Sequence, residues 1–431
     1  MTRALTCVAT LILIGAAPFS TANESSPAAP LLAWNDRVLA VAQAEDGLLT
    51  LKGLRTVTMM HLAIHDALAN IDHRYASYRY DEQIRSPDRV VAIVQAAYVV
   101  AVDQYPDQRE MFTALRDRWL PQGSMSTANK DAIELGTATA QAILDLRRGD
   151  EWDAEVEYQW HPMGPGVYAE FADHSGTPEG FVFGSGWARA RPFALERPDQ
   201  FRSPPPPSID SQEYTRAFKE VKQNGRFQSM SRSVDQTHLA MWWKDFAENS
   251  HNRLARDLVT KENLDLGVAA RLFALLNMSI YDAYVNVFDN KFYYNHWRPY
   301  TAIRWAANDG NPDTEAEDSW TNLHRHTYAF PSYPSAHGTA CAAAMSVIAD
   351  TFGDHYSFVM QIREVDVAGP YSGKILMQPP LRFFNNPLEA ARECSMSRVW
   401  LGIHFRYDST EGFELGRRIG TYVLGNYLRP K

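Results

Sequence analysis

Three clusters in the C-terminal half of the chain carry the residue types needed to hold a tetrahedral oxyanion. The residues of these clusters that could hold the anion or act on it are Lys291, Arg298, Ser335, His337, Arg398, His404 and Asp408. Three cations can neutralise an anion with two or three negative charges, because arginine matches paired oxygens while lysine acts as a point charge. Each charge-assisted hydrogen bond contributes about 1.5–3 kcal/mol. The clusters therefore predict one shared oxyanion site.

The first cluster places Lys291 and Arg298 seven positions apart. This spacing is two helical turns, so both side chains point to one side if the helix continues between them. Pro299 then stops or bends the chain.

The second cluster is typical of the start of a helix. Pro334 is preset for a helix start. Ser335 supplies a hydroxyl, and the free N–H groups of a first helical turn face an anion. His337 follows beside them and is placed to act as a general acid–base.

The third cluster adds Arg398 as a third cation and pairs a histidine with a carboxylate. His404 and Asp408 are four positions apart, which makes them neighbours on one face of a helix. The carboxylate can hold one imidazole nitrogen as a donor and leave the other free as a ligand or nucleophile.

Each of these residues also has a simpler interpretation when it is taken alone. The three cations could be surface charges, Ser335 could be only a helix cap, and each histidine could be a satisfied polar residue. Three ordered clusters that converge on one chemistry favour the shared site.

Composition limits the class of protein. The chain has 431 residues, 45% of them apolar and 22% charged, which is typical of a globular protein with a buried core. The net charge is −9 and no long basic run occurs, so nucleic-acid binding is not expected. Three cysteines exclude a disulfide scaffold. We expect Cys341 and Cys394 to be buried free thiols, although export would permit a disulfide.

The first 22 residues are typical of a signal peptide. An apolar stretch follows Arg3, and small residues allow cleavage after Ala22. We therefore expect a periplasmic or extracellular protein. No later window has 18 uncharged apolar residues, so stable membrane insertion is not expected. A homo-oligomer is compatible with the sequence.

The periodic segments that must position the clusters are helical, and the fold class is predicted to be all-α. Apolar residues recur at helical spacing over residues 54–71, 90–105, 127–146, 211–222, 234–248, 268–288, 338–352, 388–400 and 411–428. Residues 162–207 are rich in glycine and proline, which predicts a connector over the surface.

The segments on either side of the connector are related. Residues 55–70 align without gaps with residues 271–286 and share an Arg, an Ile, an Asp-Ala pair and an Asn. The predicted organisation is a signal peptide (1–22), an N-terminal bundle (23–161), the connector (162–210) and a C-terminal bundle (211–431). The positions that match Ser335, His337, His404 and Asp408 in the first bundle are Asp88, Val90, Ser124 and Ala128. The first bundle is therefore expected to be structural.

Several other groups are interpreted as structural. His61 and His65 could suggest zinc, but their repeat partners are Asn277 and Tyr281, so packing at a bundle interface is favoured. Residues 146–155 are expected to form a solvated charged turn. His324 and His326 could line the entrance to the Ser335 cluster, but solvent-facing loop positions are favoured. Core positions, rather than a platform for substrate, are favoured for the aromatic residues Tyr293, Tyr294, Trp297, Trp242 and Trp243.

Together, the three clusters resemble the signature of the vanadium-dependent haloperoxidases and of the type-2 phosphatidic acid phosphatase superfamily that shares their site. Every spacing of that signature is met: Lys, six residues and Arg-Pro; a Pro-Ser-x-His segment; and Ser-Arg, five residues, His, three residues and Asp. The resemblance is to the exported bacterial haloperoxidase-like branch and implies a two-bundle, all-α fold.

The resemblance also implies a role for each residue. The vanadate oxygens would be held by Lys291, Arg298, Ser335, the N–H of Ala336 and Arg398. His404 would be the axial metal ligand, Asp408 would orient it, and His337 would exchange protons as peroxide binds. Vanadate would act as a Lewis acid on hydrogen peroxide, which halide attacks to give hypohalous acid.

The alternative implied by the same residues is a soluble, exported acid phosphatase that needs no vanadate. His404 would attack the phosphorus of a phosphate monoester to form a phosphohistidine, and His337 would protonate the leaving oxygen. A binding protein without catalysis is disfavoured, because binding alone needs neither histidine.

One position departs from the signature. Ala336 stands where the family usually has glycine, and alanine would be strained there if the backbone needs a positive φ. Phe330 lies where related enzymes carry an aromatic residue or a histidine.

Overall fold

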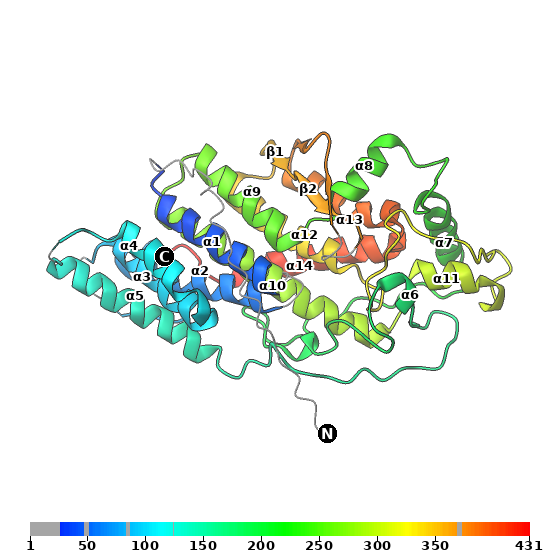
Figure 1. Cartoon of the computed structure of the whole chain (residues 1–431), viewed down its shortest axis with the longest axis horizontal. Coiled ribbons are helices and arrows are strands. Elements are labelled where there is room, and N and C mark those ends of the chain that lie inside the picture. Colours follow the sequence, from blue (N-terminus) through cyan, green and yellow to red (C-terminus); the bar gives the residue numbers. More distant parts are fainter. Residues whose placement is uncertain (1–25, 47–50, 83–86, 124, 369–372) are drawn as a thin grey trace, which may run out of the picture.

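The structure, a computed structural model, describes residues 26–46, 51–82, 87–123, 125–368 and 373–431. The expected signal peptide (1–22) and Ser124 lie outside the described residues. The described chain is predominantly helical (Figure 1), as predicted.

Fourteen α-helices are found in the described residues. They are α1 (Ala29–Asp46), α2 (Leu51–Asp72), α3 (Arg89–Gln104), α4 (Arg109–Trp119), α5 (Thr127–Leu146), α6 (Ala172–Ser175), α7 (Gln212–Asn224), α8 (Val234–Trp242), α9 (Ala247–Lys261), α10 (Leu266–Tyr294), α11 (Pro299–Trp305), α12 (Ala336–Phe352), α13 (Pro387–Leu401) and α14 (Arg406–Asn426). Four short strands pair as two antiparallel ribbons, β1 (Phe358–Gln361) with β4 (Leu381–Phe384) and β2 (Glu364–Asp366) with β3 (Lys374–Leu376).

The two related bundles predicted from the sequence are present. Helices α2, α3 and α5 pack on one another in the first half, as α10, α12 and α14 do in the second. Glycine allows the same close approach in both. A Cβ on Gly136 of α5 would lie 2.3 Å from a carbonyl oxygen of α3, and one on Gly416 of α14 would lie 2.2 Å from a carbonyl oxygen of α12.

A buried carboxylate is repeated at the same place in the two bundles. Asp66 of α2 accepts three backbone N–H hydrogen bonds of 2.6–2.9 Å from residues 78–80. Asp282 of α10 accepts three of 2.6–2.8 Å from residues 193–195. Burial raises the pKa of each to about 6, and the N–H groups oppose this shift. Each carboxylate thus anchors an irregular segment against its own bundle.

Helix α10 lies at the centre of the molecule, between the helices of the two halves (Figure 1). It is the one described helix that is long and apolar enough to cross a membrane. However, 89% of its most apolar window is buried inside the protein. The packing is that of a central core helix.

The connector does not lie on the surface throughout, so that expectation is wrong for part of it. Ala190, Phe193, Ala194 and Leu195 are at most 5% exposed. They are drawn inward because Asp282 binds the backbone of this stretch. The bundle and connector boundaries themselves remain predictions.

The expected solvated turn at residues 146–155 is also wrong at its centre. Arg147 and Asp150 are buried, and Asp150 Oδ2 accepts from Arg147 Nε at 2.7 Å and from Arg55 Nε at 2.8 Å. Arg147 also donates to the carbonyl of Pro192 at 2.8 Å. This ion network joins α2, the end of α5 and the connector.

The helix predicted over residues 234–248 is broken. Helix α8 ends at Trp242 and α9 begins at Ala247. The apolar spacing continues through the break, so periodicity could not detect it. A helix end leaves backbone carbonyls free, and the carbonyl of Trp243 is used at the site described next.

Candidate oxyanion site

Lys291 lies in the last turn of α10 and is fully buried. Its Nζ donates to the carbonyl oxygens of Pro331 at 2.9 Å and Ser332 at 2.7 Å. The helix does not continue to Arg298, as the spacing argument required, because Asn295 turns into the left-handed region with φ of 49°. Arg298 instead precedes α11 as its N-cap residue.

Arg298 nevertheless reaches the same place as Lys291. Its Nε donates to the carbonyl of Phe330 at 2.9 Å, and its Nη1 donates to the carbonyl of Ile403 at 3.0 Å. The same Nη1 lies 3.1 Å from Nε2 of His404. Adjacent carbonyls of one loop, residues 330–332, therefore hold both cations.

Ser335 is the N-cap residue of α12, as predicted. Its Oγ accepts from the N–H of Gly338 at 3.3 Å. Ala336 opens the helix and is not among the described residues with positive φ, so the expected strain is absent. Its methyl group lies at the wall of the cavity described below.

His404 and Asp408 are in contact, but they do not lie on one helix. His404 belongs to the turn before α14, and Asp408 is the third residue of that helix. The Asp408 carboxylate folds back, so that Oδ2 lies 3.0 Å from His404 Nδ1 and accepts from the N–H of Phe405 at 3.1 Å. Ser332 donates a further hydrogen bond to it. Asp408 therefore holds the Nδ1 side of the imidazole and leaves Nε2 facing Arg298.

Arg398 and His337 share one backbone anchor. Arg398, in the last turn of α13, directs Nη1 at the carbonyl of Trp243 across 3.5 Å and is hydrogen-bonded to Tyr328. His337, the second residue of α12, is also hydrogen-bonded to the backbone of Trp243. The break between α8 and α9 therefore fixes two of the predicted site residues.

Three nitrogen atoms of this group are buried and have no hydrogen-bond partner: Arg298 Nη2, Arg398 Nε and His337 Nε2. They come from three separate segments of the chain. A buried donor without a partner costs about 1–3 kcal/mol, and more when it is charged. A tetrahedral oxyanion would supply acceptors for the guanidinium groups, so the residues present fit vanadate or phosphate.

Burial governs the electrostatics of the site. Desolvation, followed by the charge of Arg298, lowers the pKa of Lys291 well below its usual value. The same two causes lower the pKa of His404, which is therefore neutral at neutral pH. Desolvation raises the pKa of Asp408 to about 6. The site holds three basic side chains and one carboxylate, and a bound anion would favour the charged forms of the basic groups.

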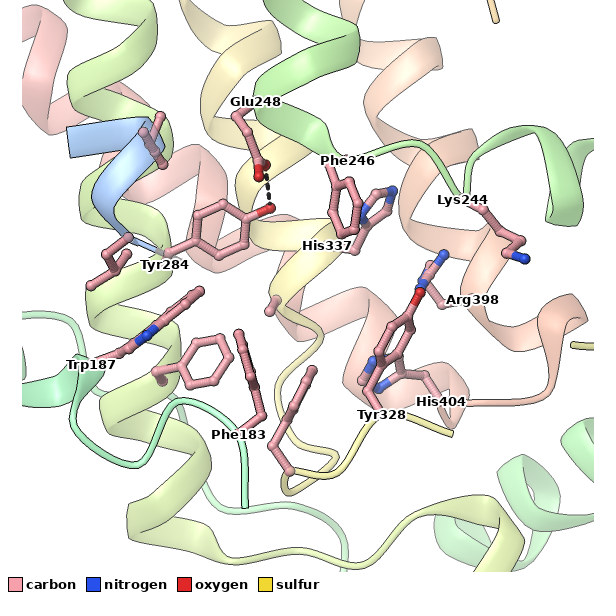
Figure 2. Close-up of a pocket in the computed structure, with 15 residues that line it drawn as sticks. Phe183, Trp187, Lys244, Phe246, Glu248, Tyr284, Tyr328, His337, Arg398 and His404 are labelled. Carbon is pink, nitrogen blue, oxygen red and sulfur yellow. Dashed lines mark hydrogen bonds between the residues drawn. The ribbon is translucent and has the colours of Figure 1, made fainter. Parts of the chain in front are cut away.

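A cavity of about 70 Å³ opens in front of these residues (Figure 2). Ala336, His337, Arg398 and His404 form one part of its wall. Most of the rest is aromatic: Phe183, Trp187, Phe246, Tyr284, Phe288, Tyr328 and Phe330. The ring centroid of Phe330 lies 4.7 Å from the guanidinium carbon of Arg298 and 5.2 Å from Lys291 Nζ.

The cavity also contains charged residues that the sequence analysis missed. Glu248 is 2% exposed and accepts a 2.9 Å hydrogen bond from the Tyr284 hydroxyl (Figure 2). Burial raises the pKa of Glu248 to about 7. Lys244, whose pKa burial lowers to about 7, donates to the carbonyls of Asp366 and Val367. No motif marks these residues, because tertiary packing brings Glu248 of α9 and Lys244 of the preceding break to the cavity.

Some of the residues interpreted as structural lie where they were expected, and others do not. His61 packs as predicted, stacked on Phe273 with a ring separation of 4.9 Å. His324 is 2% exposed, so its expected solvent-facing position is wrong. Tyr293 is 67% exposed and is not a core residue, whereas Trp242, Trp243 and Trp297 are.

The prediction of two free thiols is also wrong. Cys341 and Cys394 form a disulfide between α12 and α13, with a Cα–Cα distance of 6.6 Å. The two helices pack closely here: a Cβ on Gly338 would lie 2.4 Å from the hydroxyl oxygen of Ser395. This proximity, which the sequence separation conceals, brings the sulfur atoms together.

Residues 271–430 match the family model described as the VCPO second helical-bundle domain, and this range contains every residue of the predicted site. The second bundle is therefore similar to the second helical-bundle domain of vanadium chloroperoxidases. The family resemblance inferred from the three motifs is thereby confirmed. The vanadium chloroperoxidase of Curvularia inaequalis is 27% identical over 231 residues, which are 42% of this chain and only 37% of that protein.

Solved structures share the fold of this chain over most of its length. A bacterial vanadium-dependent iodoperoxidase is 22% identical, with a TM-score of 0.74 over 94% of this chain and 97% of that one. A bacterial vanadium-dependent chloroperoxidase in its holo form is 16% identical, with a TM-score of 0.66 over 86% of this chain and 90% of that one. At these identities the likeness establishes the common fold.

Proposed function

We propose that this chain is a vanadium-dependent haloperoxidase that oxidises halide with hydrogen peroxide. The observation that carries the proposal is a set of three buried, unpartnered nitrogen atoms, two of which belong to His337 and Arg398 in the wall of a cavity of about 70 Å³. Halide and peroxide are small enough for such a cavity. A phosphate monoester would also have to place its organic group against the aromatic wall of this cavity.

The residues that would hold vanadate are those predicted from the motifs: Lys291, Arg298, Ser335, the N–H of Ala336 and Arg398. When bound, vanadate supplies a Lewis acid that activates peroxide toward halide. His404 would be the protein ligand through Nε2, because Asp408 occupies the Nδ1 side of its ring. Its lowered pKa keeps the imidazole neutral, as a ligand must be.

His337 is the proposed acid–base group. Its Nε2 is free of protein partners, and the other side of the ring is tied to the backbone of Trp243. Burial and then Arg398 lower its pKa well below the usual value. The neutral imidazole can therefore accept a proton from hydrogen peroxide as it enters the cavity.

The experiment that tests this proposal compares two reactions in one preparation. Iodide and bromide oxidation with peroxide, and aryl-phosphate hydrolysis, are each measured with and without added vanadate. We expect halide oxidation that requires vanadate and is lost in His404→Ala. Hydrolysis that vanadate blocks, without halide oxidation, would overturn the proposal in favour of the phosphohistidine phosphatase.

We also propose that the chain is exported. The Cys341–Cys394 disulfide supports this, because disulfides persist mainly in oxidising compartments. Mass spectrometry of the protein from a secreting host should give a mature N-terminus at Asn23. An intact chain that begins with Met1 and is retained in the cytoplasm would contradict export.

A further inference from the structure

We infer that the Cys341–Cys394 disulfide is a positioning element of the oxyanion site, which sets the distance between His337 and Arg398. The inference rests on the proposed function, since it concerns affinity for an oxyanion at that site. Each cysteine lies one helical turn from a residue of the site. Cys341 lies one helical turn after His337 on α12, and Cys394 lies one turn before Arg398 on α13.

The disulfide is in direct proximity to the site. A ring nitrogen of His337 and the two sulfur atoms all lie within 4.8 Å of one another. Both cysteines are fully buried, and neither lines the cavity. The disulfide therefore lies outside the cavity wall, next to His337, and does not contact substrate.

Helices α12 and α13 also pack directly on each other, but these contacts are not covalent. Gly338 approaches Ser395 without a side chain, and the Ser395 hydroxyl donates to the carbonyl of Ser409 at the start of α14. His337 and Arg398 otherwise share only the Trp243 backbone, and the Arg398 contact is long at 3.5 Å. The disulfide is the covalent link between the helices that carry the two groups.

The chemistry of the proposed site makes such a link useful. Oxyanion donors act well only when they are held near their final geometry, and a shift of about 1 Å can cost on the order of 10²-fold in rate. Pairing the sulfurs also removes two thiols from beside a histidine proposed to handle peroxide, which oxidises thiolates readily. Separating the two cysteines should therefore weaken oxyanion binding at the site without unfolding the protein.

The test measures vanadate binding to the unloaded full chain by isothermal titration calorimetry, with circular dichroism and thermal unfolding in parallel. Cys341→Ala/Cys394→Ala should keep the helical spectrum and bind vanadate at least tenfold more weakly than wild type. Ile348→Val, a fully buried position three turns along α12 from His337, is the matched control. It should lower Tm while leaving the vanadate Kd within twofold.

If the double variant does not fold, wild type refolded with and without dithiothreitol supplies the same comparison. The dithiol gives two electrons and two protons to the S–S bond and becomes a cyclic disulfide. Thiol titration in denaturant should find two more thiols in the reduced chain. An unchanged vanadate Kd after separation, or equal thiol counts, would overturn the inference. Failure of oxidised wild type to bind vanadate would instead overturn the proposed function.

Discussion

Nδ1 of His404 and Oδ2 of Asp408 are 3.0 Å apart, although a turn of the chain separates the histidine from the helix that carries the aspartate. The carboxylate also accepts from Ser332 and from the N–H of Phe405. The orientation of His404 therefore depends on a residue that does not face the cavity.

Asp408→Asn should lower vanadate affinity and halide oxidation by about 10–100-fold, the usual cost of losing a partner that orients a metal ligand. The amide fits the same space but lacks the negative charge that strengthens the three hydrogen bonds made at Oδ2. Calorimetric titration with vanadate and steady-state kinetics measure the effect. A loss below threefold in both would show that Ser332 and the backbone orient His404 without the charge.

Arg398→Ala should reduce the rate by about 10²–10³, because the side chain is a buried donor directed at the site. Arg392→Ala is the control on the same helix, since its side chain is exposed. A loss below about tenfold for Arg398→Ala would place that residue outside the machinery that holds the anion.

Glu248→Gln should change how stability depends on pH. Burial raises the folded-state pKa of Glu248 from 4.5 to about 7, so the native state binds more protons than the unfolded state between these values. Wild-type stability from this group therefore falls as pH rises from about 4.5 to 7, by on the order of 3 kcal/mol.

The amide does not titrate. The free energy of unfolding of the variant should therefore rise relative to that of wild type across this pH interval, and the difference should stay constant above it. Urea unfolding at pH 4.5 and pH 7.5 measures the difference. A gap between the two proteins that stays constant with pH would show that Glu248 ionises normally in the native state.

Asp150→Ala should destabilise the protein by about 3–5 kcal/mol, because it leaves Arg55 and Arg147 buried without their shared carboxylate. Asp145→Ala is the matched control. Asp145 pairs with Arg148 on the surface, so its loss should cost less than about 1 kcal/mol. Similar free energies of unfolding for the two variants would contradict the role of the buried network.

Periodicity predicted the helices whose apolar faces are regular, and α5 was predicted residue for residue. It failed where tertiary contacts decide the backbone, as at Trp243, whose carbonyl anchors Arg398 and His337. The motifs predicted which residues come together but not how they meet. Lys291 and Arg298 converge because a loop offers carbonyls to both, and not because a helix continues.

The other features that were not predicted depend on contacts between residues far apart in the sequence. The Cys341–Cys394 bond spans 53 residues, and Glu248 meets Tyr284 only where α9 packs beside α10. Neither pairing leaves a local signal in the sequence. Charged residues such as Arg147 and Asp150 were assigned to solvent because their mutual neutralisation is visible only in three dimensions.

The paired carboxylates Asp66 and Asp282 have a further consequence. Both halves keep a buried carboxylate at the same place, and Asp88 caps α3 as Ser335 caps α12. The first half therefore repeats the helical framework of the second, which makes it a scaffold onto which protein engineers could graft a second reaction centre.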